Sequence, residues 1–494
     1  MNGLKVLIMS SEVAPFSKVG GLADVVGALP SALSGLGVEC KVLSPLYTSV
    51  KEKKDISLEK IEAQDEIRVH VAGREYKGDL FSAQNFGSNA QFLFLANDHF
   101  FSRNGIYADQ STGEEFSDNA ERFIFFSASV FKVIKALKWL PHVIHCNDYH
   151  TSLVPAYIKL KESKSFGSIA TLLTIHNLGY QGIFQPDVVE KAGFSMDQFK
   201  PMSPFEFYGN FNFLKLGIVY ADIINTVSET YAREITENPR YGHNLEGVLR
   251  ERLDNLFGVI NGVDYSVWDP SLDPYIPFRY SSRDLSGKLK NKKVLLERHK
   301  PMVTNLKWPL IGMISRLAHQ KGFDILIDIF PELMRENLLF ILLGTGDPNY
   351  HKIFQKFARK YPQKVGINLT FDPELAHLIE AGSDIFLMPS RYEPCGLNQM
   401  YSLRYGTVPV VRKTGGLADT VDDYNPQTGK GTGFVFENYS PSELLKAIKR
   451  GLDTYRKREK WLRIMIQGMQ ADFSWDRSAE KYLEIYRKAI KKVS

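Results

Sequence analysis

Short apolar segments alternate with amphipathic helical segments along most of this chain, and this alternation restricts its fold more than any other feature. We expect a strand at residues 4–9, a helix over residues 23–36 and a strand at residues 38–44. The same order continues with a strand at 142–146, a helix from Thr151 and a strand at 169–175. Such alternation is typical of an α/β fold with a parallel sheet covered by helices on both faces.

The alternation stops once and then starts again. A hydrophilic stretch over residues 266–300 is rich in Pro, Asp, Ser and Lys, and a fresh strand is expected at 310–314. After it we expect a helix from Gly322, a strand at 338–343, a helix from Tyr350, and strands at 384–388 and 407–411. Because 494 residues are too many for one ordinary core, we expect two doubly wound, Rossmann-like domains joined near residues 261–268. Apolar residues at helical spacing predict a last, amphipathic helix over 474–492.

Composition excludes several classes of protein. Apolar residues make up 44% of the chain and charged residues 24%, as in ordinary globular proteins. The net charge of +5 is far from the basic surface of a nucleic-acid binder. The three cysteines, Cys40, Cys146 and Cys395, are widely spaced, which indicates neither a disulfide framework nor a zinc site and favours a reducing cytoplasm. The short apolar N-terminus reads as a strand and not as a signal peptide, and no apolar run is long enough for a membrane span.

A glycine-rich loop follows the first expected strand. Lys18 stands beside Gly20 and Gly21, and a helix follows at once. Loops at the carboxyl ends of parallel strands bind anions, since glycines let the backbone approach a ligand and a lysine neutralises phosphate. The alternative is that the glycines only make a tight connection and that Lys18 is solvated. Neither of the standard glycine-rich phosphate motifs is present.

A second basic pair follows the strand that opens the second half. Arg316 leaves the strand end and Lys321 precedes a helix, so both can converge on a diphosphate. A structural salt bridge is the alternative. The chain has no Asp-x-Asp, the usual device for holding a divalent cation against a nucleotide diphosphate, so these cations would take the metal's place.

The segment over residues 389–399, PSRYEPCGLNQ, places Glu393 at the end of an apolar strand, before a proline and a glycine. Such a turn can offer free amides to a ligand while the carboxylate accepts hydroxyl hydrogens, which suits a sugar. The alternative for Glu393 is a helix-entry charge. Cys395 is interpreted as a packed small residue and not as a nucleophile.

One phrase occurs twice, as KVGGLAD at residues 18–24 and as KTGGLAD at residues 413–419. Both copies are predicted to be strand-to-helix turns that place amides at a ligand cleft, one in each domain. The flanking residues show no periodic match, so we do not infer a tandem repeat.

Six blocks together resemble bacterial glycogen synthases and plant starch synthases, and they occur in that family's order across nearly the whole chain. They are KVGGLADVVGALP (18–30), HCNDYHTSLVP (145–155), TIHNLGYQGIF (174–184), NGVDYSVWDP (261–270), SRLAHQKGFD (315–324) and the long block at 389–421. The joint specificity of the blocks is high, although each alone is modest.

The resemblance implies a retaining glucosyltransferase of the GT-B type, with two Rossmann-like domains facing each other across a cleft. It implies an N-terminal domain over 1–262 on the acceptor side, a nucleotide-sugar domain over 263–473, and a C-terminal helix over 474–494 that packs back on the first. The donor would be ADP-glucose and the acceptor an α-1,4-glucan such as glycogen, with no metal and no other cofactor. No nucleic acid or membrane partner is implied.

The resemblance also assigns residues. Lys18, Gly20 and Gly21, with Asp24 nearby, match the loop that reaches the diphosphate, and Arg316 and Lys321 match the pair that binds it. Asp148 and His176 match residues near the sugar, and Asn261 matches a polar residue at the hinge side. Glu393 matches the carboxylate that holds the donor glucose, followed by Cys395, Gly396 and Leu397, and Phe371 matches an aromatic ring against the base. For Phe371 a buried core position is the simpler alternative.

Two positions depart from the commonest bacterial pattern. Val19 and Asn398 both stand where a threonine is frequent, which bears on donor and acceptor preference more than on reaction class. ADP-glucose and UDP-glucose both remain open as donors, with ADP-glucose favoured by the resemblance. A nucleotide-sugar epimerase on the same fold and a glucan-binding protein without turnover are the competing hypotheses. Conversion of donor without glucan would indicate the first, and absence of glucose incorporation the second.

Overall fold

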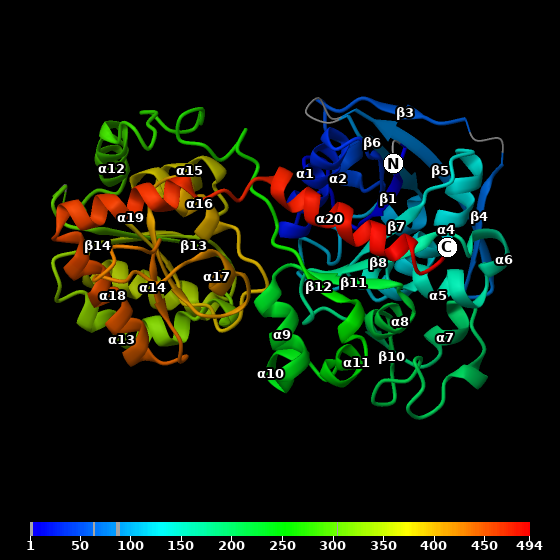
Figure 1. Cartoon of the computed structure of the whole chain (residues 1–494). Helices are drawn as coiled ribbons and strands as arrows, with labels where there is room; N and C mark the ends of the chain where they lie inside the picture. Colours follow the sequence, from blue (N-terminus) through cyan, green and yellow to red (C-terminus); the bar gives the residue numbers. More distant parts are fainter. Residues whose placement is uncertain (1–2, 63–64, 85–88, 304) are drawn as a thin grey trace. The chain divides into compact units, whose positions relative to one another are not determined.

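The computed structural model describes residues 3–62, 65–84, 89–303 and 305–494. The chain forms two compact units (Figure 1). Unit 1 contains residues 1–227, 232–262 and 475–494, and unit 2 contains residues 228–231 and 263–474. No helix among the described residues is both long and apolar enough to cross a bilayer.

Unit 1 is built on a ten-stranded sheet with a parallel centre and an antiparallel edge. Its order is β12-β11-β8-β7-β1-β2-β6-β5-β3, with β4 paired to β5. The parallel strands are β1 (Lys5–Met9), β2 (Glu39–Pro45), β6 (Gln91–Ala96), β7 (Val143–Asn147), β8 (Ala170–Ile175), β11 (Ile223–Thr226) and β12 (Leu256–Gly258). The edge strands β3 (Leu58–Lys60), β4 (Ile67–Val71) and β5 (Arg74–Ala83) pair antiparallel.

Burial along the strands explains the difference between centre and edge. Strand β8 is buried at every position, as expected where helices cover both faces of a sheet. Strand β4 instead alternates between buried and exposed residues, because one of its faces is solvated. The alternation of strands and helices predicts the parallel centre of the sheet but not this antiparallel edge.

Helices and a short hairpin complete unit 1. The longer helices are α1 (Gly21–Gly35), α4 (Asn119–Ala136), α5 (Leu153–Leu160), α8 (Phe213–Tyr220) and α20 (Trp475–Ile490). The short ones are α2 (Thr48–Lys51), α3 (Asp98–Phe101), α6 (Ser163–Phe166), α7 (Val188–Lys191), α10 (Pro239–Gly242) and α11 (Glu246–Arg250), while α9 (Glu229–Glu237) follows β11. The hairpin pairs β9 (Ile183–Phe184) with β10 (Phe211–Asn212).

Unit 2 has a six-stranded, fully parallel sheet in the order β15-β14-β13-β16-β17-β18. The strands are β13 (Leu310–Ile314), β14 (Leu339–Leu343), β15 (Val365–Asn368), β16 (Ile385–Met388), β17 (Val408–Arg412) and β18 (Phe434–Phe436). The helices are α12 (Ser286–Arg298), α13 (Phe323–Leu333), α14 (Pro348–Lys360), α15 (Pro373–Gly382), α16 (Asn398–Arg404), α17 (Gly415–Thr420), α18 (Pro441–Tyr455) and α19 (Arg458–Gln470). Its core packs aliphatic strand residues against aromatic residues such as Phe330 and Phe354.

Each expected strand lies within one residue of an observed strand at both of its ends. The helix expected from Thr151 begins at Leu153, after a 3₁₀ turn over Tyr149–Thr151. Helix α12 lies within the polar stretch over 266–300. It was not predicted, because it has too few apolar residues to show the apolar spacing of an amphipathic helix.

The last helix, α20, packs on the sheet and on α1 of unit 1 (Figure 1). Two of its tyrosines make buried hydrogen bonds there. The hydroxyl of Tyr486 lies 2.9 Å from Nδ1 of His145 on β7, and Asn225 on β11 donates to the hydroxyl of Tyr482 at 3.2 Å. The hydroxyl of Ser478 donates to the carbonyl of Ile260 at 2.8 Å.

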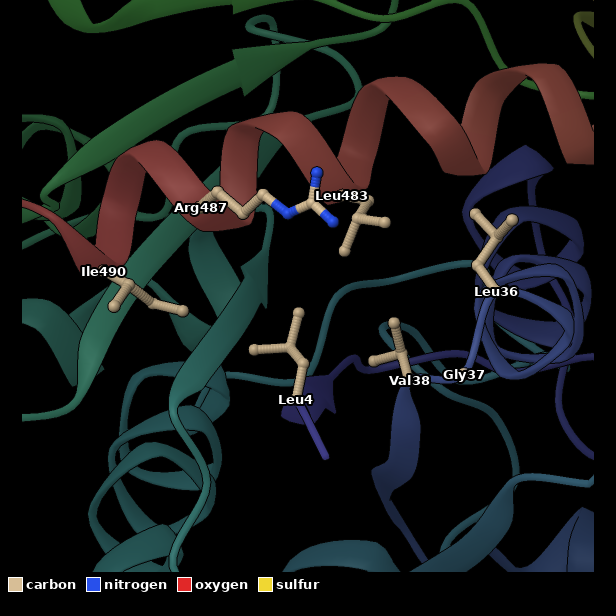
Figure 2. A pocket seen from close by; sticks show the side chains of 7 residues that line it. All are labelled: Leu4, Leu36, Gly37, Val38, Leu483, Arg487 and Ile490. Carbon is tan, nitrogen blue, oxygen red and sulfur yellow. The ribbon is translucent and has the colours of Figure 1, made fainter. Parts of the chain in front are cut away.

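A small apolar cavity lies under α20 (Figure 2). Its lining is aliphatic apart from one guanidinium, and consists of Leu4, Leu36, Gly37, Val38, Leu483, Arg487 and Ile490. Leu4 and Val38 come directly before β1 and β2. The cavity is therefore at the amino ends of these strands, whereas ligands of open α/β sheets bind at the carboxyl ends.

Candidate functional site

The loop after β1 is held in place by a buried carboxylate. Glu12 is 3% exposed, and its Oε2 accepts the N–H of Gly20 at 2.9 Å and the N–H of Val19. Its Oε1 accepts the hydroxyl of Tyr107 at 2.5 Å. The amides of Val19 and Gly20 are therefore hydrogen-bonded within the protein, and the prediction that this copy of the phrase places its amides at a ligand cleft is wrong for these two residues.

Lys18 and Gly20 face outward from the same loop. Nζ of Lys18 lies 2.6 Å from Oδ1 of Asp24 in the first turn of α1, which begins at Gly21. Burial raises the pKa of Asp24, while the nearby Lys18 ammonium opposes this shift. A Cβ added at Gly20 would meet no atom within 4 Å, so packing does not require glycine there and a ligand can approach the backbone.

Asp148 and His176 meet at the carboxyl ends of β7 and β8. Asp148 has a φ of 55°, a conformation uncommon for a residue with a side chain. Its Oδ1 accepts the N–H of His176 at 2.7 Å, and Nε2 of His176 lies 2.8 Å from Oδ1 of Asn147. Burial raises the pKa of Asp148 to about 7, opposed by the bond from His176, and burial lowers the pKa of His176 to about 3.

Asn261 lies near the end of the second segment of unit 1. It is buried, and within the described residues its Oδ1 has no hydrogen-bond partner. A buried amide oxygen without a donor costs free energy unless a ligand or water supplies one. This makes Asn261 a candidate ligand contact, as the sequence analysis expected of it.

In unit 2, Lys321 and the buried Glu393 form a partly buried ion pair. Nζ of Lys321 lies 2.7 Å from Oε2 and 3.0 Å from Oε1 of Glu393. The hydroxyl of Ser390 donates to Oε2 at 2.9 Å. The salt-bridge alternative for Lys321 is thus present, and its partner is the other residue that the sequence singled out.

Backbone contacts bring this pair together. The N–H of Arg391 donates to the carbonyl of Gln320 at 2.7 Å, which ties the loop after β16 to the loop before α13. Gly322 has a φ of +76°, and a Cβ there would lie 2.0 Å from the carbonyl oxygen of Pro389. Only glycine fits this approach, so the glycine after Lys321 sets the position of the lysine.

Arg316 is exposed, two residues after β13. Its loop packs against a glycine-rich segment after β14, where the N–H of Leu317 donates to the carbonyl of Thr345 at 2.8 Å. Gly344 and Gly346 both have positive φ, and a Cβ at Gly344 would lie 1.8 Å from the carbonyl oxygen of Ser315. The sequence analysis missed this segment, although two glycines spaced by one residue after an apolar strand are a usable signal.

The second copy of the repeated phrase serves packing. A Cβ at Gly415 would lie 1.9 Å from the carbonyl oxygen of Glu393, and one at Gly416 would lie 2.0 Å from that of Cys395. The N–H of Gly416 donates to the carbonyls of Glu393 and Pro394, both at 3.1 Å. The prediction that this copy offers its amides at a cleft is therefore wrong for Gly416, which uses its amide to hold the Glu393 loop.

Cys395, Gly396 and Leu397 connect Glu393 to α16. Cys395 is a buried free thiol, which agrees with a packing role. Within the described structure, the N–H groups of Gly396 and Leu397 donate to no carbonyl and no side chain. These two amides are available to a ligand.

Phe371 lies between β15 and α15, and its side chain is 80% exposed. The alternative of a buried core residue is therefore wrong. An exposed aromatic ring at the carboxyl edge of a parallel sheet is available for stacking.

Over residues 3–62, 65–84, 89–303 and 305–494, no group of three or more His, Cys, Asp or Glu residues is arranged to hold a metal ion. The residues that sequence reasoning missed are Glu12, Tyr107 and the segment 344–346. For Glu12 and Tyr107 no local signal exists, because their hydrogen bond joins positions 95 residues apart.

Comparison with known proteins agrees with this architecture. The sequence model described as starch synthase catalytic domain matches residues 5–251, and the one described as glycosyl transferases group 1 matches residues 297–464. Glycogen synthases of Thermotoga maritima and Thermosipho africanus are each 45% identical to the chain, and each comparison covers 99% of this chain and all of the relative.

One solved structure is similar over nearly the whole chain. It is the catalytic domain of Starch Synthase IV from Arabidopsis thaliana bound to ADP and acarbose, with a TM-score of 0.89 and 31% identity over 99% of this chain and 100% of that one. Two Rossmann-like units and these matches define a glycosyltransferase of the GT-B class. Within that class, the chain belongs to the family of glycogen synthases and starch synthases.

Proposed function

We propose that this protein transfers glucose from ADP-glucose to the non-reducing 4-hydroxyl of an α-1,4-glucan, with retention of configuration, in glycogen biosynthesis. The observation that carries the proposal is the partly buried Lys321–Glu393 ion pair at the carboxyl edge of the unit 2 sheet. The pair places a cation that can bind phosphate beside a carboxylate that can accept hydrogen bonds from sugar hydroxyls. Phosphate and sugar are the two parts of a nucleotide sugar that lie on either side of the bond that breaks.

In this proposal the domain over residues 263–473, which makes up nearly all of unit 2, holds the donor. Arg316 and Lys321 bind the diphosphate, and the free amides of Gly396 and Leu397 add neutral donors. Glu393 accepts hydrogen bonds from the glucose hydroxyls, and Cys395 supports its loop from within the core. The exposed ring of Phe371 stacks on the adenine.

The domain over residues 1–262, with the helix at 474–494, carries the acceptor side and makes up nearly all of unit 1. Lys18 acts on the donor diphosphate, with Gly20 and Gly21 giving the ligand close access and Asp24 orienting the lysine. Asp148 and His176 lie near the transferred sugar, and Asn261 uses its unsatisfied amide oxygen on a ligand hydroxyl. His176 with a pKa near 3 is neutral at physiological pH, so it can donate or accept a hydrogen bond without adding charge.

The chemical role of the three cations is to stabilise the charge of departing ADP. When the bond from the anomeric carbon to the diphosphate breaks, negative charge grows on the phosphate oxygens. Lys18, Arg316 and Lys321 stabilise that charge, and the acceptor hydroxyl attacks from the same face. Glu393 then orients the sugar and need not form a covalent bond. We place the reaction in the cytoplasm, where the three free cysteines remain reduced.

The test is incubation with glucose-labelled ADP-glucose or UDP-glucose, with and without glycogen. We expect label in α-1,4 linkages of glycogen with ADP-glucose, and only slow hydrolysis when glycogen is left out. Conversion of the donor without glycogen would favour an epimerase, and glycogen binding without incorporation would favour a binding protein. Either result would refute the proposal.

A further inference from the structure

Glu12 is a buried carboxylate with no place in the reaction proposed above. Both of its oxygens are used, since Oε2 accepts the amides of Val19 and Gly20 and Oε1 accepts the hydroxyl of Tyr107. A buried ionised group costs free energy unless hydrogen bonds compensate for lost water. Three donors provide that compensation, and the adjacent N-terminus of α1 favours negative charge.

The partners of Glu12 are themselves fixed. The hydroxyl of Tyr107 lies 2.7 Å from Oγ of Ser11, and its ring stacks on His150 at 4.8 Å between centroids. His150 is buried and follows Asp148 by two residues. Glu12 therefore connects the loop that carries Lys18 to the part of unit 1 that carries Asp148.

The loop is clamped on both sides of Lys18. On one side, Val13 and Ser17 exchange two backbone hydrogen bonds of 3.0 and 2.8 Å. On the other side, Glu12 holds the amides of Val19 and Gly20. Between the clamps the Lys18 side chain is half-exposed and meets only Asp24 among the described residues.

We infer that Glu12 is a positioning residue, which fixes the backbone of the Lys18 loop so that the lysine is presented in one place. The inference of loop fixation rests on the structure, and its value for turnover rests on the proposed function. Glu12 does not touch the substrate. It acts through the two amides that follow Lys18.

Amide hydrogen exchange tests the fixation directly, with the full-length protein and no ligand. In Glu12→Ala, we expect the amides of Val19 and Gly20 to exchange about 10- to 100-fold faster, since each loses a hydrogen bond to a charged acceptor. In Glu12→Gln they should stay protected, because the amide oxygen can accept both bonds while its NH₂ faces the Tyr107 oxygen. Glu39→Ala is the matched control, since Glu39 is a carboxylate of unit 1 that accepts from Trp139, away from this loop.

Glucosyl transfer provides the second measurement. We expect kcat/KM for ADP-glucose to fall about 100-fold in Glu12→Ala, as for a group misplaced by about 1 Å. Glu12→Gln should stay within about tenfold of the wild type, and Glu39→Ala should be unchanged. An equal loss in Glu12→Ala and Glu12→Gln, with protection retained in the glutamine variant, would overturn the inference by showing that the charge itself acts.

The exchange result separates this inference from the proposed function. Unchanged exchange of Val19 and Gly20 in Glu12→Ala would overturn the inference whatever the activity. Lost protection with unchanged kcat/KM would overturn the positioning role. If the wild type transferred no glucose at all, the proposed function would fail, and exchange alone would decide whether Glu12 fixes the loop.

Discussion

Burial tunes Asp148 and His176 in opposite directions, although the two residues are hydrogen-bonded neighbours. Removal from water disfavours the charged form of each group, so the pKa of the carboxyl rises to about 7 and that of the imidazole falls to about 3. His176 is therefore neutral near pH 6, where Asp148 is mostly protonated. A site that binds a polyanionic donor repels it less when the site itself carries little negative charge.

The shift of Asp148 predicts a pH dependence of stability. The pKa of Asp148 in the folded state lies above its usual value of 3.8, so the folded protein binds the proton more tightly and loses stability as pH rises through about 7. From pH 5 to pH 8 we expect the wild type to lose about 2–3 kcal/mol of unfolding free energy relative to Asp148→Asn. Thermal unfolding of both proteins across this range measures it. A constant difference between them would contradict the assignment.

We expect substitution of Phe371 to weaken ADP binding without changing the stability of the protein. Because its ring is 80% exposed, Phe371→Ala should leave the melting temperature unchanged. Loss of a stacking surface should weaken ADP binding by about 1 kcal/mol, measured by calorimetry. Leu272→Ala is the control, since Leu272 is an exposed apolar residue of the same unit at 58%. Equal ADP affinity in Phe371→Ala and the wild type would exclude the stacking role.

At the scale of elements, the two copies of the repeated phrase have different physical reasons. Gly20 has open space around its missing side chain, whereas Gly415 and Gly416 lie against the carbonyls of the Glu393 loop. The same sequence therefore leaves open space before α1 and serves close packing at the start of α17. Local sequence does not distinguish these cases, because the difference comes from segments distant in the chain.

Alanine substitutions separate the two cases. Gly416→Ala places a Cβ 2.0 Å from the carbonyl oxygen of Cys395, so we expect a loss of about 1–3 kcal/mol in stability. Gly20→Ala meets no atom within 4 Å and should melt like the wild type. Thermal unfolding of the two variants side by side measures this. Equal melting temperatures would show that the close approach at Gly416 is not present in solution.

A structural feature could be predicted from the sequence when the residues that determine it are close together in the chain. Strands such as β1, β7 and β13 were placed nearly to the residue, because buried parallel strands are continuous apolar runs bounded by polar residues. Lys321 and Glu393 were found by their place after strands, but their ion pair was not, because it depends on the contact between Arg391 and Gln320. The role of Glu12 and the positive φ of Asp148 leave no local pattern to detect.

At the scale of the whole molecule, the chain places its candidate residues at the carboxyl ends of two separate sheets. Lys18, Asp148 and His176 follow β1, β7 and β8 of unit 1. Arg316, Lys321 and Glu393 follow β13 and β16 of unit 2. Unit 1 also contains both ends of the chain, since α20 returns to its sheet. In the proposed function, Lys18, Arg316 and Lys321 together stabilise the departing diphosphate.

The turnover of Lys18→Ala with ADP-glucose and glycogen tests that claim most directly. Lys18 belongs to unit 1, and its half-exposed side chain pairs with the partly exposed Asp24, so the variant should fold normally. If Lys18 stabilises the departing diphosphate, kcat should fall about 10²- to 10³-fold. A kcat equal to that of the wild type would contradict the account.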